Sequence, residues 1–453
     1  MPDRLTPFLV LLLCLSACTD SHWHPDPATS DAKTLKIAVF GSAAGNEQNY
    51  SASHEAADLA QQSPEVKALQ DSVKFEPRED AESIAQAIDY ARRIRDDPDV
   101  LAVVGHSYSG TTRAALPIYE QAGIPVLIAT ATSPYVMYKF DERGAWPGVA
   151  ELENREAPYP RFRNAFRLIP SDVPSQVEAI EAATLKLLGV RNEEEPPAHS
   201  ASNQPAKKPK IMLVCDATRR NGAEVYTRPI CESLLHERNP QLSIANYVAR
   251  YKEIDADTVD VWEMVTEIHA VMRNEQAKRI VFVGYSELAR VLLEELKERS
   301  ESVKDDMSKY TFIMSEACLS NELLDFGATL YVTSPFNPSR VLKCLPKLQD
   351  MVQEKNIVPS AEAYTYDAVV ILAKAANDCK AKNQLGRECV LDYLQQNGDN
   401  LPGQCEKYWI GNGERKAAPY YVYASCSGEL RPTWEIGTEH EIYEKWPCQQ
   451  SAK

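Results

Sequence analysis

The sequence predicts an α/β fold with two doubly wound lobes that are joined by a hinge of several strands. Short apolar runs rich in β-branched residues alternate with segments of helical periodicity along most of the chain. This alternation occurs in two series, which begin at Leu35 and Ile211 and are separated by a polar insertion at 192–210. The 453 residues include 44% hydrophobic side chains, which are sufficient for the cores of two domains.

The elements are expected in the following order along the chain. In the first series, strands are expected at Leu35–Phe40, Val73–Phe75, Val100–Val104 and Ile124–Ala129, and helices at Glu55–Leu69, at Ala81–Ile94 and from Ala114 to Gly123. A strand at Phe166–Asp172 then leaves one lobe for the other, and a helix follows at Gln176–Leu188. In the second series, strands are expected at Ile211–Cys215, Ala245–Tyr251, Arg279–Gly284 and Tyr310–Ser315, and helices at Ala223–His236 and Val259–Met272. The chain is expected to cross back at Tyr331–Pro335, form a helix at Tyr364–Asn377 and end in antiparallel strands around Tyr408–Ile410 and Tyr420–Ala424.

The first 18 residues resemble a bacterial export signal that ends in a lipidated cysteine. Phe8–Leu15 is an apolar core that follows a basic residue and is too short for a permanent membrane span. The next residues complete the sequence LSAC, which is similar to a lipobox and ends in Cys18. We therefore expect a signal peptide at 1–17, a lipid anchor on Cys18 and a polar tether at 18–33. A plain secretory signal is the alternative, and with either signal the mature protein would work outside the cytoplasm.

The segment from Val100 to Pro134 predicts a β-α-β unit with a binding site at the ends of its strands. Hydroxylated residues follow both strands: Ser107, Ser109, Thr111 and Thr112 come after the first, and Thr130 and Thr132 come after the second. Ligands of open parallel sheets bind beyond the carboxyl ends of the strands. The helix that starts between these strands offers unpaired N–H groups and the positive end of its dipole. The unit therefore predicts a site for a small anionic group such as a carboxylate.

The same residues also resemble the nucleophile elbow of an α/β-hydrolase, with Ser107 as the nucleophile. The elbow requires a very small residue at the position of Ser109, and Gly110 comes one place late. A catalytic triad further needs an acid and then a histidine downstream. The downstream histidines are His199, His236, His269 and His440, and none follows an expected strand end. A serine hydrolase is therefore the less favoured reading.

Composition excludes some partners and leaves room for disulfides. The net charge of −16 argues against a nucleic-acid partner. No CxxC pair occurs, so a zinc site is not expected, and no cofactor is predicted. Nine cysteines lie beyond the leader: Cys215, Cys231, Cys318, Cys344, Cys379, Cys389, Cys405, Cys426 and Cys448. Among the possible disulfides we favour Cys379–Cys389 and Cys405–Cys426, and the odd count leaves at least one thiol unpaired.

Several motifs, in their order and spacing, resemble those of the type I periplasmic binding proteins. They are VVGHSYSGTT, AGIPVLIATATSP, FRLIPSDVPSQ, FVGYSE, AYTYDAVVILAKA and YWIGNGERKAAPYYVY. Within that fold the chain is similar to the leucine/isoleucine/valine-binding receptors of ABC transporters. The resemblance covers nearly all of Leu35–Pro432 apart from two insertions. It implies one lobe at 34–170 and 335–402, a second at 171–334 and 403–435, and a tail at 436–453.

The resemblance also implies a set of residues that bind an amino-acid-like ligand. Ser109 matches a serine that binds the α-carboxylate, and Thr130 and Thr132 match a turn that holds the carboxylate and the ammonium. Glu316 matches the acid that pairs with the ammonium. Tyr285 matches an aromatic residue of the closing lobe, and Asp172 matches a residue at the lobe crossing. A strand-end carboxylate facing an ammonium would make a charge-assisted hydrogen bond.

This sequence departs from the family where the ligand's side chain would bind. The loop Gly41–Gly45 is shorter than usual and lacks the expected aromatic residue, for which Tyr50 is a possible replacement. The usual aromatic-Gly pair after the first strand of the second lobe is replaced by Asn221-Gly222. A preference for leucine is therefore not implied.

Taken together, the sequence predicts a non-enzymatic receptor of the bacterial cell envelope. The receptor would be anchored to a membrane through lipid, bind an amino acid or a similar small molecule, and deliver it by hinge closure to an ABC permease and its ATPase. The alternative from another class is an interaction protein, because the same fold occurs in lipoproteins that act as sensors or regulate cell-wall synthases. Loss of Ser109 and Glu316 would have favoured that alternative, and both are present.

Overall fold

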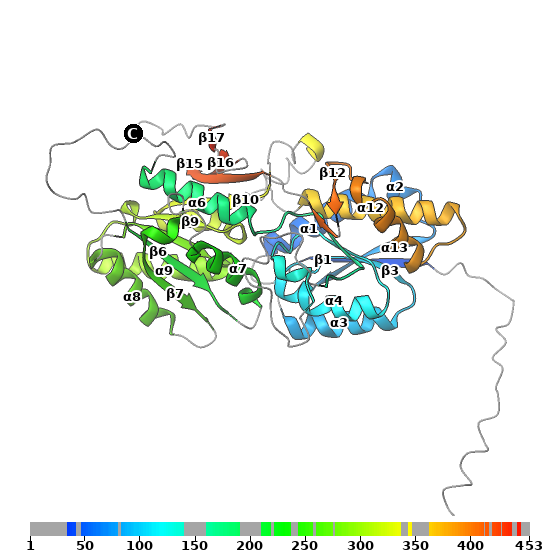
Figure 1. Cartoon of the computed structure of the whole chain (residues 1–453), viewed down its shortest axis with the longest axis horizontal. Coiled ribbons are helices and arrows are strands. Elements are labelled where there is room, and N and C mark those ends of the chain that lie inside the picture. Colours follow the sequence, from blue (N-terminus) through cyan, green and yellow to red (C-terminus); the bar gives the residue numbers. More distant parts are fainter. Residues whose placement is uncertain are drawn as a thin grey trace, which may run out of the picture. The chain divides into compact units, whose positions relative to one another are not determined.

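The computed structural model of the chain describes the part of the protein that follows the leader (Figure 1). The described residues are 34–41, 47–79, 83–139, 160–190, 210–218, 222–236, 243–256, 260–274, 277–336, 343–346, 362–411, 413–415, 419–426, 428–436 and 442–444. The predictions for the signal peptide, Cys18, the tether and most of both the 192–210 insertion and the tail lie outside these ranges. No helix within the described ranges has the length and apolar character needed to cross a membrane.

Five parallel strands form the first sheet of the described structure. Their order is β2 (Val73–Glu79), β1 (Leu35–Gly41), β3 (Val100–Val104), β4 (Val126–Ile128) and β5 (Ala165–Arg167). Successive side chains of a strand point to opposite faces of its sheet. Ile37 and Val39 accordingly pack in one core, whereas Ala38 and Phe40 pack in another. This sheet is therefore covered on both faces, as its continuous apolar strands predict.

Different helices cover the two faces of the first sheet (Figure 1). One face is covered by α1 (Glu47–Gln61), α2 (Pro64–Lys67), α12 (Glu362–Ala381) and α13 (Arg387–Gln396), and the other by α3 (Ile84–Asp96) and α4 (Ser109–Gln121). The single helix expected at Glu55–Leu69 is instead divided between α1 and α2. The cause is local, because Ser63 caps α2 by accepting a hydrogen bond from the backbone N–H of Val66, and Pro64 suits the first helical position.

Eight of the described strands form a second, mixed sheet. Its order is β17 (Ile442–Glu444), β16 (Glu429–Ile436), β15 (Tyr420–Cys426), β10 (Thr329–Ser334), β9 (Thr311–Met314), β8 (Arg279–Val283), β6 (Ile211–Asp216) and β7 (Val248–Ile254). The strands from β10 to β7 are parallel, and β15 to β17 are antiparallel. One face carries α6 (Ser175–Leu188) and α7 (Ala223–Leu235), and the other α8 (Val261–Asn274) and α9 (Ser286–Ser302). The α/β prediction with two sheets is confirmed.

The C-terminal third of the chain contributes strands to the second sheet and side chains to the core against the first sheet. Tyr331–Ser334, which we expected to be a crossing segment, instead belongs to β10 and pairs with β9 and β15. The short strands predicted near Tyr408 and Tyr420 are antiparallel. Tyr408 and Ile410 pack in a core of the first sheet. We had expected residues 403–435 to belong to the second lobe. The other lobe boundaries stay predictions.

Three disulfides have both cysteines among the described residues. Cys379–Cys389 is present as predicted. The predicted Cys405–Cys426 pair is wrong, because Cys405 is bonded to Cys344, 61 residues away. Cys215–Cys231 was not foreseen, and it joins β6 to α7. Cys318 is a free, buried thiol, which agrees with the expected unpaired cysteine.

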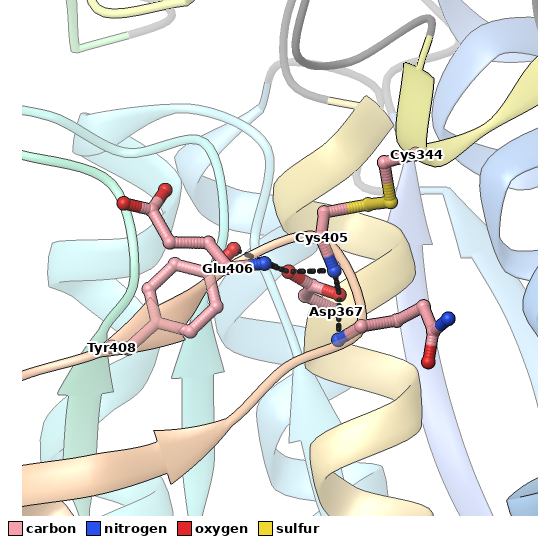
Figure 2. Close-up of a disulfide and its surroundings, with 6 residues drawn as sticks. Cys344, Asp367, Cys405, Glu406 and Tyr408 are labelled. Carbon is pink, nitrogen blue, oxygen red and sulfur yellow. Dashed lines mark hydrogen bonds between the residues drawn. A yellow bond between two sulfur atoms is a disulfide. The ribbon is translucent and has the colours of Figure 1, made fainter.

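The Cys344–Cys405 disulfide lies beside a buried carboxylate that holds one loop in place (Figure 2). Asp367 of α12 accepts hydrogen bonds from the backbone N–H groups of Gln404, Cys405 and Glu406 and from the Tyr408 hydroxyl. Burial nevertheless raises the pKa of Asp367 to about 6, because desolvation outweighs the lowering by these donors. Asp367 therefore connects α12 to the loop at 403–406.

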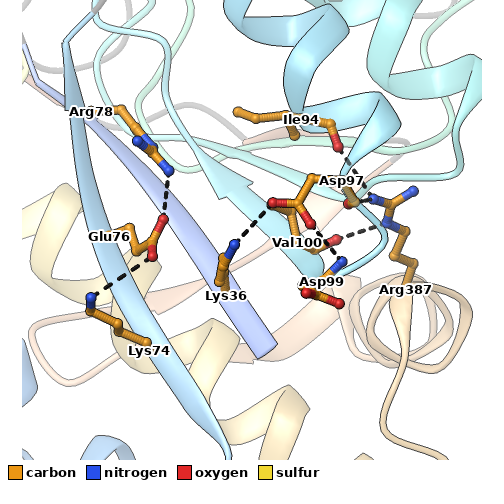
Figure 3. Close-up of polar contacts among 9 residues, drawn as sticks. All are labelled: Lys36, Lys74, Glu76, Arg78, Ile94, Asp97, Asp99, Val100 and Arg387. Atoms are coloured by element: carbon orange, nitrogen blue, oxygen red, sulfur yellow. Dashed lines mark hydrogen bonds and ion pairs between the residues drawn. The ribbon is translucent and has the colours of Figure 1, made fainter. Parts of the chain in front are cut away.

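A second polar cluster joins α13 to the start of β3 (Figure 3). The Arg387 guanidinium donates hydrogen bonds to the carbonyl oxygens of Val100 and Asp97, at the junction between α3 and β3. Lys36 of β1 pairs with the carboxylate of Asp97 at 3.0 Å. The cluster satisfies carbonyl groups at the end of α3, which have no partner within the helix.

We predict that Asp367→Ala lowers the free energy of unfolding by about 3–5 kcal/mol, because three backbone donors would lose their acceptor in a buried loop. Asp378→Ala on the same helix is the matched control, since its ion pair with Lys382 is at the surface. That control should cost less than about 1 kcal/mol. Urea unfolding of both variants measures the difference, and equal losses would contradict this role for Asp367.

Candidate functional site

A cavity of about 170 Å³ lies between strand ends of the first sheet and strand ends of the second. Residues that follow β3 and β4 form one wall: Ser107, Tyr108, Ser109, Thr130 and Thr132. The facing wall comes from α7, from the start of α9 and from the segment after β9: Tyr226, Tyr285, Ser286, Glu287 and Glu316. The two parallel series therefore meet at one site, as expected for ligand sites of open α/β sheets.

Hydroxyl groups order the wall that the first sheet provides. The Thr130 hydroxyl donates to the carbonyl oxygen of Ser107 at 2.7 Å, which joins the turns after β3 and β4. The Ser109 hydroxyl, at the first residue of α4, accepts a hydrogen bond from the backbone N–H of Ser133 at 3.3 Å. Its own hydrogen is then available for another acceptor, whereas the hydrogen of the Thr130 hydroxyl is already in use.

Aromatic rings line the junction between the two walls. Tyr285 caps the N-terminus of α9, and its backbone N–H donates to the Asp216 carboxylate at 3.4 Å. The Tyr285 ring stacks on Tyr226 of α7 at 5.3 Å and meets Tyr108 of the opposite wall edge to face at 5.2 Å. These rings give the site an apolar surface between two polar ends.

Two carboxylates interact at the back of the cavity: Glu316 belongs to its wall, and Asp172 lies behind the lining. Asp172 follows β5 and is fully buried, and its backbone N–H donates to the carbonyl oxygen of Thr132 at 3.0 Å. The Gln176 amide, oriented to satisfy both neighbours, donates to Asp172 Oδ1 at 2.9 Å and accepts from the Glu316 backbone N–H at 2.7 Å. Oδ2 of Asp172 and Oε2 of Glu316 are buried and have no hydrogen-bond partner in the described part of the chain.

The two carboxylates bind protons more readily than free side chains do. Burial raises the pKa of Asp172 to about 7, against the lowering by the Thr132 hydroxyl and the Arg167 charge. Burial also raises the pKa of Glu316 well above its usual value, and repulsion from Asp172 adds to this effect. Because the two groups disfavour each other's charge, the pair keeps a proton at neutral pH.

The positive charge of Arg167 lowers the pKa of both carboxyl groups. Arg167 is the last residue of β5 and is fully buried. Its Nη1 atom donates to the carbonyl oxygens of Thr132 and Ser133, at 2.8 and 2.6 Å. Arg167 therefore holds the turn after β4 and supplies one positive charge to a cluster that contains two acids.

The two walls touch each other beside the cavity. The Ser133 hydroxyl donates to the carbonyl oxygen of Val225 in α7. Gly222 caps α7 with φ of +71°, and a Cβ atom built there would lie 2.8 Å from the Cα atom of Gly110 in α4. Only a residue without a side chain fits this approach, so glycine at 222 is required for the contact between α4 and α7.

Comparisons with known proteins agree with this geometry. Residues 225–411 match the model of the "Receptor family ligand binding region". The leucine-binding protein LivK of Thermotoga maritima superimposes with a TM-score of 0.65 and 16% identity, over 90% of this chain and 100% of that one. This chain has a type I periplasmic-binding-protein fold.

Other solved structures with this fold have different ligands. The branched-chain amino acid transporter substrate-binding protein LivJ of Streptococcus pneumoniae, in complex with isoleucine, has a TM-score of 0.61 and 17% identity, over 91% of this chain and 100% of that one. A solute-binding protein of R. palustris in complex with benzoate has a TM-score of 0.61 and 12% identity, over 88% of this chain and 95% of that one. No curated protein sequence matches this chain. At these identities the likeness establishes the fold and leaves the ligand open.

The type I fold brings most of the sequence-predicted residues to one place. Those that line the cavity are Ser109, Thr130, Thr132, Tyr285 and Glu316. Asp172 lies behind this lining, next to Thr132 and bridged to Glu316 by Gln176. Their roles in ligand binding stay predictions. The Gly41–Gly45 loop beyond its first residue, the Tyr50 side chain and Asn221 lie outside the described part.

Among the site residues that sequence reasoning missed are Arg167, Tyr226, Glu287 and Glu362. Arg167 carried a usable signal, because a charged residue inside an apolar strand needs a buried partner. The other three lie in or at the start of helices, where tyrosine and glutamate are common at the surface, so their spacing carried no signal.

The described cavity wall does not supply the histidine that a serine hydrolase needs as its general base. Ser107 lines the cavity, but no histidine is among the described lining residues. The His106 ring instead pairs through Nε2 with the Tyr119 hydroxyl at 2.9 Å. His269 is buried on α8 beside Asp305, and His236 ends α7. His199 and His440 lie outside the described residues.

We predict that Gly222→Ala separates the two walls, because the new methyl group would overlap Gly110. Gly189→Ala is the matched control, since its φ of +74° imposes similar backbone strain while no atom lies within 4 Å of its Cβ position. Both variants should lose about 1 kcal/mol of stability. Small-angle X-ray scattering should show a larger radius of gyration for Gly222→Ala only, and equal radii would contradict the role of this contact.

Proposed function

We propose that the protein is a non-enzymatic receptor that binds an amino acid or a similar small molecule between its two walls. The ammonium group of the ligand would bind at Glu316 and Asp172, and its carboxylate at the start of α4. The observation that carries this proposal is the charge of the buried cluster. The cluster contains two carboxylates with unpaired oxygens, and the positive charge of one guanidinium, that of Arg167, lowers the pKa of both.

The charge of the cluster favours a cationic ligand group. With both acids ionised, Asp172, Glu316 and Arg167 together carry one excess negative charge. Without a ligand, the raised pKa values of the two carboxyls favour a proton that offsets this charge. An ammonium group can replace that proton and donate to the unpaired oxygens of both acids.

The opposite wall favours an anionic ligand group. Ser109 begins α4, a helix of 13 residues, and its hydroxyl can donate into the cavity. The N-terminus of such a helix attracts a carboxylate through its N–H groups and its dipole. The cavity volume of about 170 Å³ is suited to a molecule smaller than a typical drug. These features together support a small zwitterion.

The structural neighbours support a transport role. Solute-binding proteins with this fold include LivJ, a transporter substrate-binding protein in complex with isoleucine. By analogy, the receptor would deliver its ligand to an ABC permease and its ATPase. The LSAC sequence supports an anchor at Cys18 on the outer side of a bacterial membrane.

A thermal-shift screen of the protein from Thr19 onward against the common amino acids tests the proposal. A ligand that binds only the folded state raises Tm with concentration. Glu316→Ala should abolish the shift, because the ammonium would lose its half-buried acceptor. Glu298→Ala, an exposed change on α9, is the control and should keep it. No shift at millimolar ligand, or a shift that survives Glu316→Ala, would contradict the proposed ammonium site.

We further predict that affinity for the ligand rises with pH up to about 7, the pKa of Asp172. Protonation of the carboxyl pair competes with the ammonium, so Kd should increase about tenfold for each pH unit below that value. Isothermal titration calorimetry in buffers of different ionisation enthalpy would measure both Kd and proton release. A constant Kd between about pH 5 and 8 would mean that ligand binding does not displace a proton from the carboxyl pair.

A further inference from the structure

We propose that Gln176 is a positioning residue of the ammonium site. It binds one oxygen of Asp172 and the backbone of Glu316, and it leaves other oxygens of both acids for the ligand. This inference rests on the proposed function and names the residue that prepares its site. Gln176 is the second residue of α6 and is not among the described residues that line the cavity, so it would act through the two acids.

The Gln176 amide joins the two acids across the two sheets. Its Nε2 atom donates to Asp172 Oδ1 at 2.9 Å, and its Oε1 atom accepts from the backbone N–H of Glu316 at 2.7 Å. The backbone N–H of Gln176 also donates to the carbonyl oxygen of Asp172, at 2.8 Å. Asp172 follows β5 of the first sheet, whereas Glu316 follows β9 of the second. One side chain therefore sets the position of each acid relative to the other.

The surroundings of Gln176 hold its amide in this orientation. The side chain is fully buried. The hydroxyl groups of Tyr226 in α7 and Thr333 in β10 lie 3.5 and 3.4 Å from the two polar ends of the amide. A hydroxyl can donate or accept, so both contacts are compatible with the bonds to the acids. A neutral amide offers a donor and an acceptor together, whereas a glutamate at 176 would add a third buried acid to the cluster.

The contacts of Gln176 prepare the acids for a cation. Oδ2 of Asp172 and Oε2 of Glu316 are buried and lack a hydrogen-bond partner in the described part of the chain, so they can accept from an ammonium group. An N–H donor on a carboxylate stabilises its ionised form. Gln176 therefore makes the proton on the pair easier to replace by the ligand. Without this donor, the pair would retain its proton to a higher pH.

The other titratable groups that face the carboxyl pair do not change charge near neutral pH. In the described structure they are Arg167 of β5, Tyr226 of α7, Tyr364 of α12 and Tyr420 of β15. Burial raises the pKa of each tyrosine above its usual value of about 10, and a guanidinium stays protonated in proteins. A protonation change of the cluster near pH 7 therefore reports on the two carboxyl groups.

Infrared spectroscopy of the ligand-free protein tests the role of Gln176, because a protonated carboxyl group has its own absorption band. The part of this band that Asp172→Asn removes should titrate at about pH 7 in the wild-type protein. In Gln176→Met, which keeps the side-chain length but neither hydrogen bond, the midpoint should lie about one pH unit higher. Thr184→Val is the matched control, since Thr184 is also fully buried on α6 and its hydroxyl donates to the Ile180 carbonyl oxygen of the same helix. The control should keep the wild-type midpoint.

An unchanged midpoint in Gln176→Met would overturn the inference. An equal rise in Thr184→Val would overturn it as well, because the rise would then come from a packing defect in α6. If Gln176→Met does not fold, Gln176→Glu replaces it, and its additional acid should raise the midpoint further. No rise in that variant would also overturn the inference. The titration needs no ligand, so it is independent of the thermal-shift screen, whose failure would overturn the proposed function instead.

Discussion

The burial of Asp172 and Glu316 next to each other is the constraint on which the rest of the site depends. Two carboxylates removed from water repel one another and lose their hydration, so the pair costs stability unless protons or cations compensate. Thr132, Gln176 and Arg167 provide part of this compensation. Two buried oxygens remain without a hydrogen bond in the described structure. A fold optimised only for stability would have placed apolar residues there, so the arrangement supports the proposed ligand site.

The remainder of the described structure holds these groups in position. Asp172 follows a strand of the first sheet and Glu316 follows a strand of the second, so their proximity requires both sheets. Asp367 and the Cys344–Cys405 disulfide fix the loop that follows α13. Arg387 joins α13 to the start of β3, the central strand of the first sheet. These cross-links join segments that are distant in the sequence around the first sheet.

The sequence predicted the fold and the strand ends well, for physical reasons. Val100–Val104 is entirely apolar because both of its faces are covered, and such an apolar run can be recognised in the sequence alone. Ser109 and Glu316 follow such strands, so their place at the sheet edge could be inferred. Glu362 begins a helix whose register with the sheet depends on long-range packing. The partner of Cys405 depends likewise on a contact across 61 residues, which spacing along the chain cannot indicate.

A ligand bound as proposed would couple binding to closure through the separation of charge between the walls. On the proposed function, a zwitterion presents its carboxylate to α4 on one wall and its ammonium to Glu316 on the other. Each group is then satisfied only when both walls contact the same molecule, so a ligand with one charge would engage one wall and leave the second solvated. The hydrogen bond from the Ser133 hydroxyl to the Val225 carbonyl oxygen joins the two walls directly, and on the proposed function it would add to the stability of a closed form. A carboxyl pair that is neutralised by a proton in the absence of ligand lowers the repulsion that would otherwise oppose closure, and the arriving ammonium takes over this role.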